Sequence, residues 1–408
     1  MDLADAVLPL IRTQSQVWRW NVANQHGARM HDGVDLLEAA LGAEDPQVVF
    51  DVTKRAIASA YTIIARADDS SGIIGGAVCR LLELHPQAAA LAQPSAKKLV
   101  EWMMKMIFHD KVNYFQIDPV AYAPALGDAG MKLYRQALSD KAATLGQRPA
   151  WSDRWSSPHS HEWFALGYND QRLAVLDRDV DRIIETHLGD GTVAAWYLDT
   201  AKALAEIGQW DLAIEWAQRG AGVSPSHQAE KAAHYWCELL TEHRLDQVLT
   251  ARLEVFRRWP TATNAGSLHD AAGRDWPEYE PEVMAALATQ PREAVSFAQH
   301  GLKDIRLAWS LAYDLGLDSA GQWSSLAKAY QKIDPLATLP IHRDLVEDTL
   351  QVTDAKRYRD AARRLATMRK LAAGTDQADG VDVFIAELRD IHRRRPRLQL
   401  EFDRAGLP

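Results

Sequence analysis

The sequence predicts an all-α protein in which an N-terminal helical domain is followed by an α-solenoid of paired helices. Three observations lead to this fold class. Apolar residues recur with the period of an amphipathic helix along most of the 408 residues. The Val/Ile/Thr alternation that marks a half-buried strand is nearly absent. Residues 195–225 have the spacing of a complete two-helix repeat, a unit that buries its apolar face only by packing on neighbours.

The stretch 195–225 places small side chains where two helices must approach closely and bulky ones where a neighbouring repeat is gripped. Gly208 marks the turn between the helices and Pro225 closes the unit. The small residues are Ala201, Ala213, Ala217 and Gly220, and the bulky ones are Tyr197, Leu204 and Trp210. This order resembles a tetratricopeptide repeat, and a degenerate copy follows about 35 residues later at Leu245-Asp246, Val248 and Pro260. The solenoid is therefore expected to be tetratricopeptide-like.

The N-terminal domain is expected to comprise residues 1–150, because the Pro-, Trp- and Ser-containing stretch 146–161 is typical of a long connection. Its expected helices are 2–42 as one or two short helices, 46–65, 73–84 ending near His85-Pro86, 97–108, and 119–140 in two pieces separated around Gly127-Asp128.

The remainder is expected to form repeats over residues 151–350 and basic helices over 351–408 that cap the solenoid. Helical patterns cover 170–187, 336–350, 356–373 and 381–394, and a weaker repeat unit starts at Trp323.

Charge and cysteine content favour a cytoplasmic protein. The net charge is −9, with +4 over residues 351–408 and −13 before them, which argues against attraction of the whole chain to nucleic acid. Cys79 and Cys237 form no disulfide framework, fit a reducing compartment, and are expected to be small buried residues. The first residues lack the features of a signal peptide, and no apolar run is long enough for a membrane span.

Two blocks of sequence carry a family resemblance. They comprise residues 68–72, 98–102, 108–110 and 122–130 in the first half, and 343–347, 358–362, 384–389 and 405–407 in the second. Together they resemble the helical region that follows the zinc finger in bacterial SWIM zinc-finger proteins. The CxC and CxH pairs of the finger are absent from this sequence, so the resemblance implies a helical architecture. It implies neither DNA binding through the finger nor catalytic residues.

Asp68, Asp69, Ser70, Ser71 and Gly72 offer carboxylates and hydroxyls that could hold a cation or phosphate. The same residues suit the N-terminal cap of the helix expected at residue 73, and this second interpretation is preferred. His85 and His109 fall at expected helix ends, where a structural role is favoured over an acid/base pair.

Other features give weaker indications of a site. His159, His161 and Glu162 are close in sequence, but a two-residue spacing does not place both histidines on one helical face. No cofactor or metal ion is therefore expected. The sharpest charged feature is a basic cluster near the C-terminus: Arg389, Arg393, Arg394, Arg395 and Arg397.

Three functional hypotheses follow. The leading one is a non-enzymatic interaction protein that binds a peptide or protein in the concave groove of its solenoid. The second is an accessory protein of a nucleic-acid system that docks through the basic cluster. The third is an enzyme whose site joins Asp68, Asp69, His85 and His109, and this hypothesis is the least favoured because no catalytic motif is evident.

Overall fold

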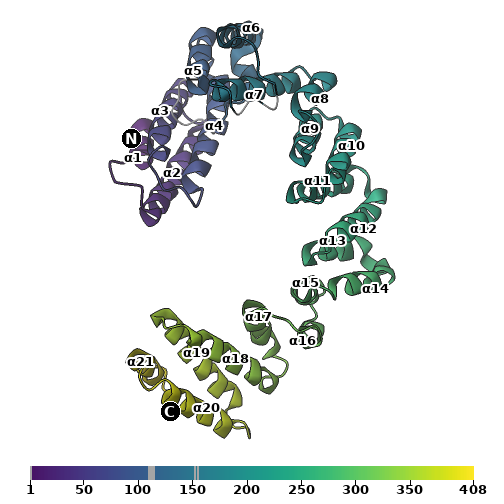
Figure 1. Ribbon diagram of the computed structural model, residues 1–408. Helices are drawn as coiled ribbons and strands as arrows, with labels where there is room; N and C mark the ends of the chain where they lie inside the picture. Colours follow the sequence, from purple (N-terminus) through teal and green to yellow (C-terminus); the bar gives the residue numbers. More distant parts are fainter. Residues whose placement is uncertain (1, 109–114, 151–152, 154–155) are drawn as a thin grey trace. The chain divides into compact units, whose positions relative to one another are not determined.

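The computed structural model describes residues 2–108, 115–150, 153 and 156–408, and within these ranges it contains helices and no strand (Figure 1). The all-α prediction is thus confirmed. The chain divides into two compact units, residues 1–224 (unit 1) and 225–408 (unit 2). The division at residues 150 and 350 stays a prediction.

Unit 1 contains ten α-helices among its described residues. They are α1 (Leu3–Ile11), α2 (Trp20–Ala40), α3 (Pro46–Ile64), α4 (Ile73–Ala92), α5 (Ala96–Phe108), α6 (Pro119–Leu145), α7 (Ser160–Leu176), α8 (Val180–Leu188), α9 (Ala194–Glu206) and α10 (Trp210–Gly222). Helices α1–α4 enclose one apolar core and α5–α7 contribute most of a second. From α7 to α10, each helix packs against the next one along the chain.

Within unit 2, most helices also pack against the next one along the chain. Its α-helices are α11 (His227–His243), α12 (Val248–Arg258), α13 (Ala262–Ala272), α14 (Trp276–Leu287), α15 (Pro291–Ser296), α16 (Ile305–Asp314), α17 (Ala320–Tyr330), α18 (Leu339–Gln351), α19 (Ala355–Ala372), α20 (Ala378–Ile391) and α21 (Pro396–Arg404). Short helical turns are η1 (Leu245–Gln247), η2 (Gly273–Asp275), η3 (Phe297–Gly301) and η4 (Leu336–Thr338).

The two-helix repeat predicted at 195–225 is confirmed in α9 and α10. Ala201, Ala213 and Ala217 are fully buried where the two helices pack together. Gly208 makes the turn with φ +78°, a conformation that favours glycine. Trp216 is buried, whereas 41% of the surface of Trp210 is exposed. Trp210 therefore packs against a neighbour with only part of its side chain.

Two expected helix boundaries are wrong. Helix α4 continues through Pro86 to Ala92 because His85 and Pro86 are both buried, and packing compensates for the backbone hydrogen bond that proline cannot make. The helix expected over 170–187 is two helices, α7 and α8, separated at Arg178, whose φ is +56°. Cys79 is also exposed, contrary to expectation, while Cys237 is buried.

The interruption expected around Gly127-Asp128 is confirmed. Gly127 lies inside α6 with φ +58° and ψ −177°, so the helix has two straight pieces with a kink between them. A residue with a Cβ atom adopts this backbone conformation rarely, because the Cβ atom would clash with neighbouring backbone atoms. The kink positions the second piece of α6, residues 128–145, which lines the groove described below.

Close packing of α2 on α4 depends on Gly27, and we expect Gly27→Ala to lower the free energy of unfolding by about 2 kcal/mol. A Cβ atom at this buried position would lie 2.5 Å from Cγ2 of Ile73. That clash outweighs the gain of about 1 kcal/mol that alanine brings to a helix interior. Urea denaturation of the full chain, followed by circular dichroism, measures the change.

Gly76→Ala on α4 is the matched control. Its Cβ would lie 3.6 Å from Nε2 of His31, an ordinary van der Waals distance, so its stability should be unchanged or higher. Equal stability of the two variants would contradict the assigned role of Gly27.

Candidate functional site

The acidic loop before α4 caps that helix. The two carboxylate oxygens of Asp69 accept hydrogen bonds from the backbone amides of Ile74 and Gly75, each at 2.8 Å. Asp68 accepts from the amide of Ser70 at 3.3 Å, and the Ser71 hydroxyl donates to Asn24. Because the first amides of a helix lack partners within the helix, these carboxylate contacts satisfy a local requirement.

His85 lies inside α4 and not at a helix end, contrary to expectation. Its ring is fully buried between Phe50 and Trp102, with ring centroids 4.8 and 4.4 Å away. Nδ1 of the ring lies within hydrogen-bond distance of the Tyr122 hydroxyl, at 2.7 Å. Burial, assisted by the charge of Lys54, lowers the pKa of His85 to about 3. The ring is therefore neutral at physiological pH.

Asp69 and His85 do not share a site. The amide of Gly75, to which Asp69 is bonded, lies ten residues before His85 on the same helix, about 15 Å at 1.5 Å per residue. His109 lies outside the described residues. Among the described residues, no group of three or more His, Cys, Asp or Glu could hold a metal ion.

The basic C-terminal residues divide into two sets. Arg389 donates to Gln399 at 3.0 Å, to Asp403 at 2.8 Å and to the carbonyl of Leu407 at 3.0 Å, and Arg395 donates to the carbonyl of Leu350 at 2.7 Å. These two arginines fasten α21 and α18 within unit 2. The exposed members are Arg393, which is 3.3 Å from Asp390, and Arg394 and Arg397, which have no partner among the described residues.

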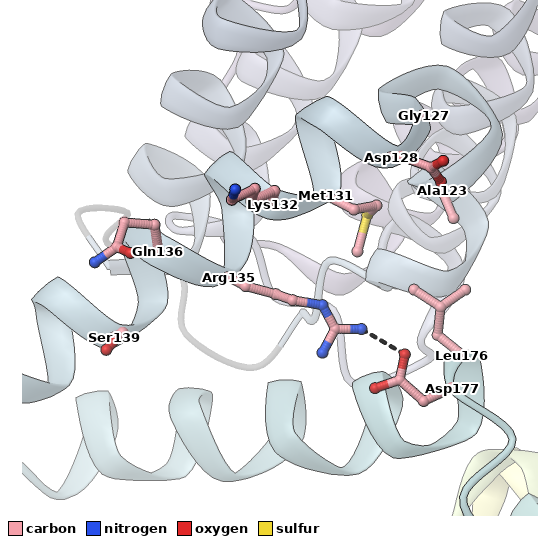
Figure 2. A pocket seen from close by; sticks show the side chains of 10 residues that line it. All are labelled: Ala123, Gly127, Asp128, Met131, Lys132, Arg135, Gln136, Ser139, Leu176 and Asp177. Carbon is pink, nitrogen blue, oxygen red and sulfur yellow. Dashed lines mark hydrogen bonds and ion pairs between the residues drawn. The ribbon is translucent and has the colours of Figure 1, made fainter.

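An open groove follows the kink of α6, and Figure 2 shows the side chains that line it. Its volume is about 590 Å³. Arg135 reaches across from α6 to Asp177 at the end of α7, with an ion-pair distance of 2.6 Å (Figure 2). Lys132, Gln136 and Ser139 lie on the same piece of α6. Arg135 and Asp177 therefore partly neutralise each other within the groove, which Lys132 and Asp128 also line.

A second pocket, of about 520 Å³, lies between α7, α8 and the segment 148–150. One wall is aromatic, formed by Trp163, Phe164 and Tyr168 of α7. Phe164 keeps 51% of its surface exposed, whereas burial raises the pKa of Tyr168 to about 12. A wall of aromatic side chains with a few polar groups at its rim is the usual composition of a ligand or peptide pocket. We call it the aromatic pocket.

Polar contacts at the rim hold the aromatic pocket in shape. Arg148 pairs with Asp170 at 2.9 Å, and the side-chain amide of Gln171 donates to the backbone carbonyl of Thr186 at 3.1 Å. Gly167 lets Arg148 lie against α7, because a Cβ atom there would be 3.1 Å from its guanidinium. The pocket therefore depends on residues from both helices and from the preceding segment.

Sequence reasoning missed this pocket, although part of its signal was present. Phe164 and Tyr168 are four residues apart and so share one face of a helix. Phe164 and Tyr168 belong to a helix only because α7 begins at Ser160. The helix expected to start at residue 170 excludes both of them. In the nearby acidic and histidine stretch, His159 Nδ1 lies 3.4 Å from Glu162, which is an ordinary pair one turn apart.

No described helix has both the length and the apolar character that crossing a membrane requires.

Comparisons with known proteins give a family. The model of a family described as "Family of unknown function (DUF6880)" matches residues 8–397. No curated protein matches the chain. Among solved structures, the chain is similar to a protein titled "Circular tandem repeat protein with novel repeat topology and enhanced subunit contact surfaces", with 15% identity, a TM-score of 0.22, and coverage of 99% of this chain and 87% of that one. At this TM-score, the similarity carries no argument about the arrangement of the chain.

Proposed function

We propose, from the premise that the chain belongs to the family of unknown function DUF6880, that it is a non-enzymatic interaction protein whose helical repeats bind a peptide or protein partner. The observation that carries this proposal is the aromatic pocket between α7 and α8. Aromatic side chains bury a large apolar area at little entropic cost, and for this reason they dominate binding interfaces. The expected concave groove of a solenoid is part of this proposal.

The resemblance to the helical region of SWIM zinc-finger proteins supports the proposal without extending it to an activity. We propose on this basis that the chain is a bacterial relative of that region and works in the cytoplasm. The sequence patterns further support basic helices over 351–408 that close the solenoid.

Phe164→Glu is expected to weaken capture of the partner. Truncating or charging an aromatic anchor at the centre of an interface costs about 2 kcal/mol or more, which is about 30-fold in affinity. Tagged full-length protein is used to capture partners from the lysate of its own cells, with and without nuclease, and bound proteins are quantified by mass spectrometry. The expected result is a stoichiometric protein that resists nuclease and is reduced at least 10-fold with Phe164→Glu.

Val383→Glu on α20 is the matched control, because Val383 is 58% exposed and lies outside the aromatic pocket. It should capture the partner like the wild type. An equal loss of partner capture in both variants would contradict the assignment of binding to the aromatic pocket. A partner that disappears after nuclease treatment and is lost with Arg394→Ala/Arg397→Ala would instead support the nucleic-acid hypothesis.

A further inference from the structure

Arg364 on α19 joins three helices of unit 2 through neutral groups. Its Nη1 donates to Nδ1 of His342 on α18 at 3.1 Å, and its Nη2 donates to the hydroxyl of Ser324 on α17 at 2.8 Å. A guanidinium has five N–H donors, so three of them are left by these two contacts. Arg364 and Ser324 are each partly exposed, whereas His342 is buried.

Among the residues that the structure describes, Arg364 has no carboxylate partner, unlike Arg172 and Arg80, which are also partly buried. Arg172 contacts Asp118 and Glu206, and Arg80 contacts two carboxylates on α2. No carboxylate among the described residues lies within ion-pair distance of Arg364, and the nearby Asp360 is paired with Arg363. Burial lowers the pKa of Arg364 and outweighs the opposing charge of Asp360, whereas hydrogen bonds to Glu38 and Asp35 raise the pKa of Arg80.

His342, which accepts from Arg364, also has a polar atom without a hydrogen-bond partner among the described residues. Arginine also donates to Nδ1 of His26 and of His31, and in both rings Nε2 donates to a backbone carbonyl, of Ile11 and Ile73 respectively, at 3.0 Å. In His342, Nε2 is buried and has no partner. Because a guanidinium can only donate, Nδ1 must accept and Nε2 must carry the hydrogen. Burial and the charge of Arg364 lower the pKa of His342 to about 4, which keeps the ring neutral.

We propose that Arg364, with Ser324 and His342 positioning its guanidinium, binds a carboxylate supplied by a peptide. A half-buried cation with no carboxylate at ion-pair distance is unfavourable, and an anion that binds directly to it reduces that cost. The planar fork of a guanidinium matches both oxygens of a carboxylate, and a single positive charge balances its single negative charge. Phosphate, which carries more charge, is usually met by several cations. This site belongs to unit 2 and does not depend on the aromatic pocket of unit 1.

The test uses N-acetylglycine as a small carboxylate probe and N-acetylglycinamide as its neutral counterpart, at matched ionic strength. Full-length protein labelled with ¹⁵N-histidine is titrated, and the signal that is absent from His342→Gln identifies His342. We expect a saturable shift of this signal with the carboxylate, no saturable shift with the amide, and at least 10-fold weaker binding of inorganic phosphate. Arg364→Met should abolish the shift, and Phe164→Glu should leave it unchanged.

Stability measurements separate a binding role from a structural one. Since Arg364 has no ionic partner to lose, Arg364→Met should keep the Tm of the unliganded protein within about 3 °C of the wild type. Arg364→Lys retains the charge without the fork and should bind the probe at least 5-fold more weakly. A large loss of Tm in Arg364→Met, undiminished binding in either variant, an equal response to the amide, or tighter binding of phosphate would each overturn the proposal.

Discussion

Replacing Arg172 with methionine is expected to lower the free energy of unfolding by about 3 kcal/mol. Arg172 on α7 lies between Asp118, which precedes α6, and Glu206 at the end of α9. It contacts Asp118 through two nitrogens at 2.9 Å and Glu206 through two nitrogens at 2.7 Å. Only 15% of its side-chain surface is exposed, so the variant leaves two carboxylates in a partly dehydrated site without their cation.

Hydrogen bonding outweighs burial at Arg172. Burial by itself lowers the pKa of the guanidinium, but the hydrogen bonds to Glu206 and Asp118 raise it well above its ordinary value. In the folded chain, Arg172 therefore interacts with Asp118 and Glu206 more strongly than the same charges interact when separated in water. Asp118 also accepts from the amide of Val120 at 3.0 Å and so caps α6. We infer that Arg172 fixes the start of α6 and the end of α9 to α7, near the aromatic pocket.

A triple variant isolates the charge effect. Arg172→Met combined with Asp118→Asn and Glu206→Gln removes all three charges and retains a side chain that can cap α6. It should recover more than half of the stability that Arg172→Met loses in urea denaturation of the full chain. An Arg172→Met variant as stable as the wild type would show that the ion pairs contribute nothing. Comparison with Arg364→Met tests whether the carboxylates, and not burial alone, make Arg172 structural.

Acidification is expected to destabilise the protein through His85 by about 3 kcal/mol between pH 7 and pH 4. The folded-state pKa of His85 is lowered to about 3 by burial and by Lys54, whereas an unfolded histidine titrates at about 6.5. Between these values the unfolded chain binds a proton that the folded chain rejects. The stabilising contribution is therefore complete above about pH 6.5 and is lost as the pH falls toward 3.

His85→Gln removes this titration and should flatten the dependence of stability on pH. Glutamine can donate a hydrogen bond to the Tyr122 hydroxyl or accept one from it, so the buried hydroxyl keeps a partner. Urea denaturation at pH 7, 6, 5 and 4 gives the two curves. The variant is expected to be less stable at pH 7, with a difference from the wild type that narrows at lower pH. Parallel curves would contradict a depressed pKa at His85.

The sequence by itself determined the features that depend on neighbours along the chain. The helical period, the tight packing of α9 on α10 and the glycine turn at Gly208 all follow from side-chain size and backbone freedom within about one turn. The kink at Gly127 belongs to the same group. These properties are local, because helical hydrogen bonds join residues four positions apart.

Tertiary structure alone decided where local signals conflict and where distant residues meet. A proline ordinarily ends a helix, but burial of His85 and Pro86 holds α4 together through it. Ser324, His342 and Arg364 are on three helices, and no spacing in the sequence predicts their contact. The free energy of burial and of charge pairing depends on every group that packs nearby. The sequence therefore determined the helical repeats, and only their packing decided which polar side chains lack a partner.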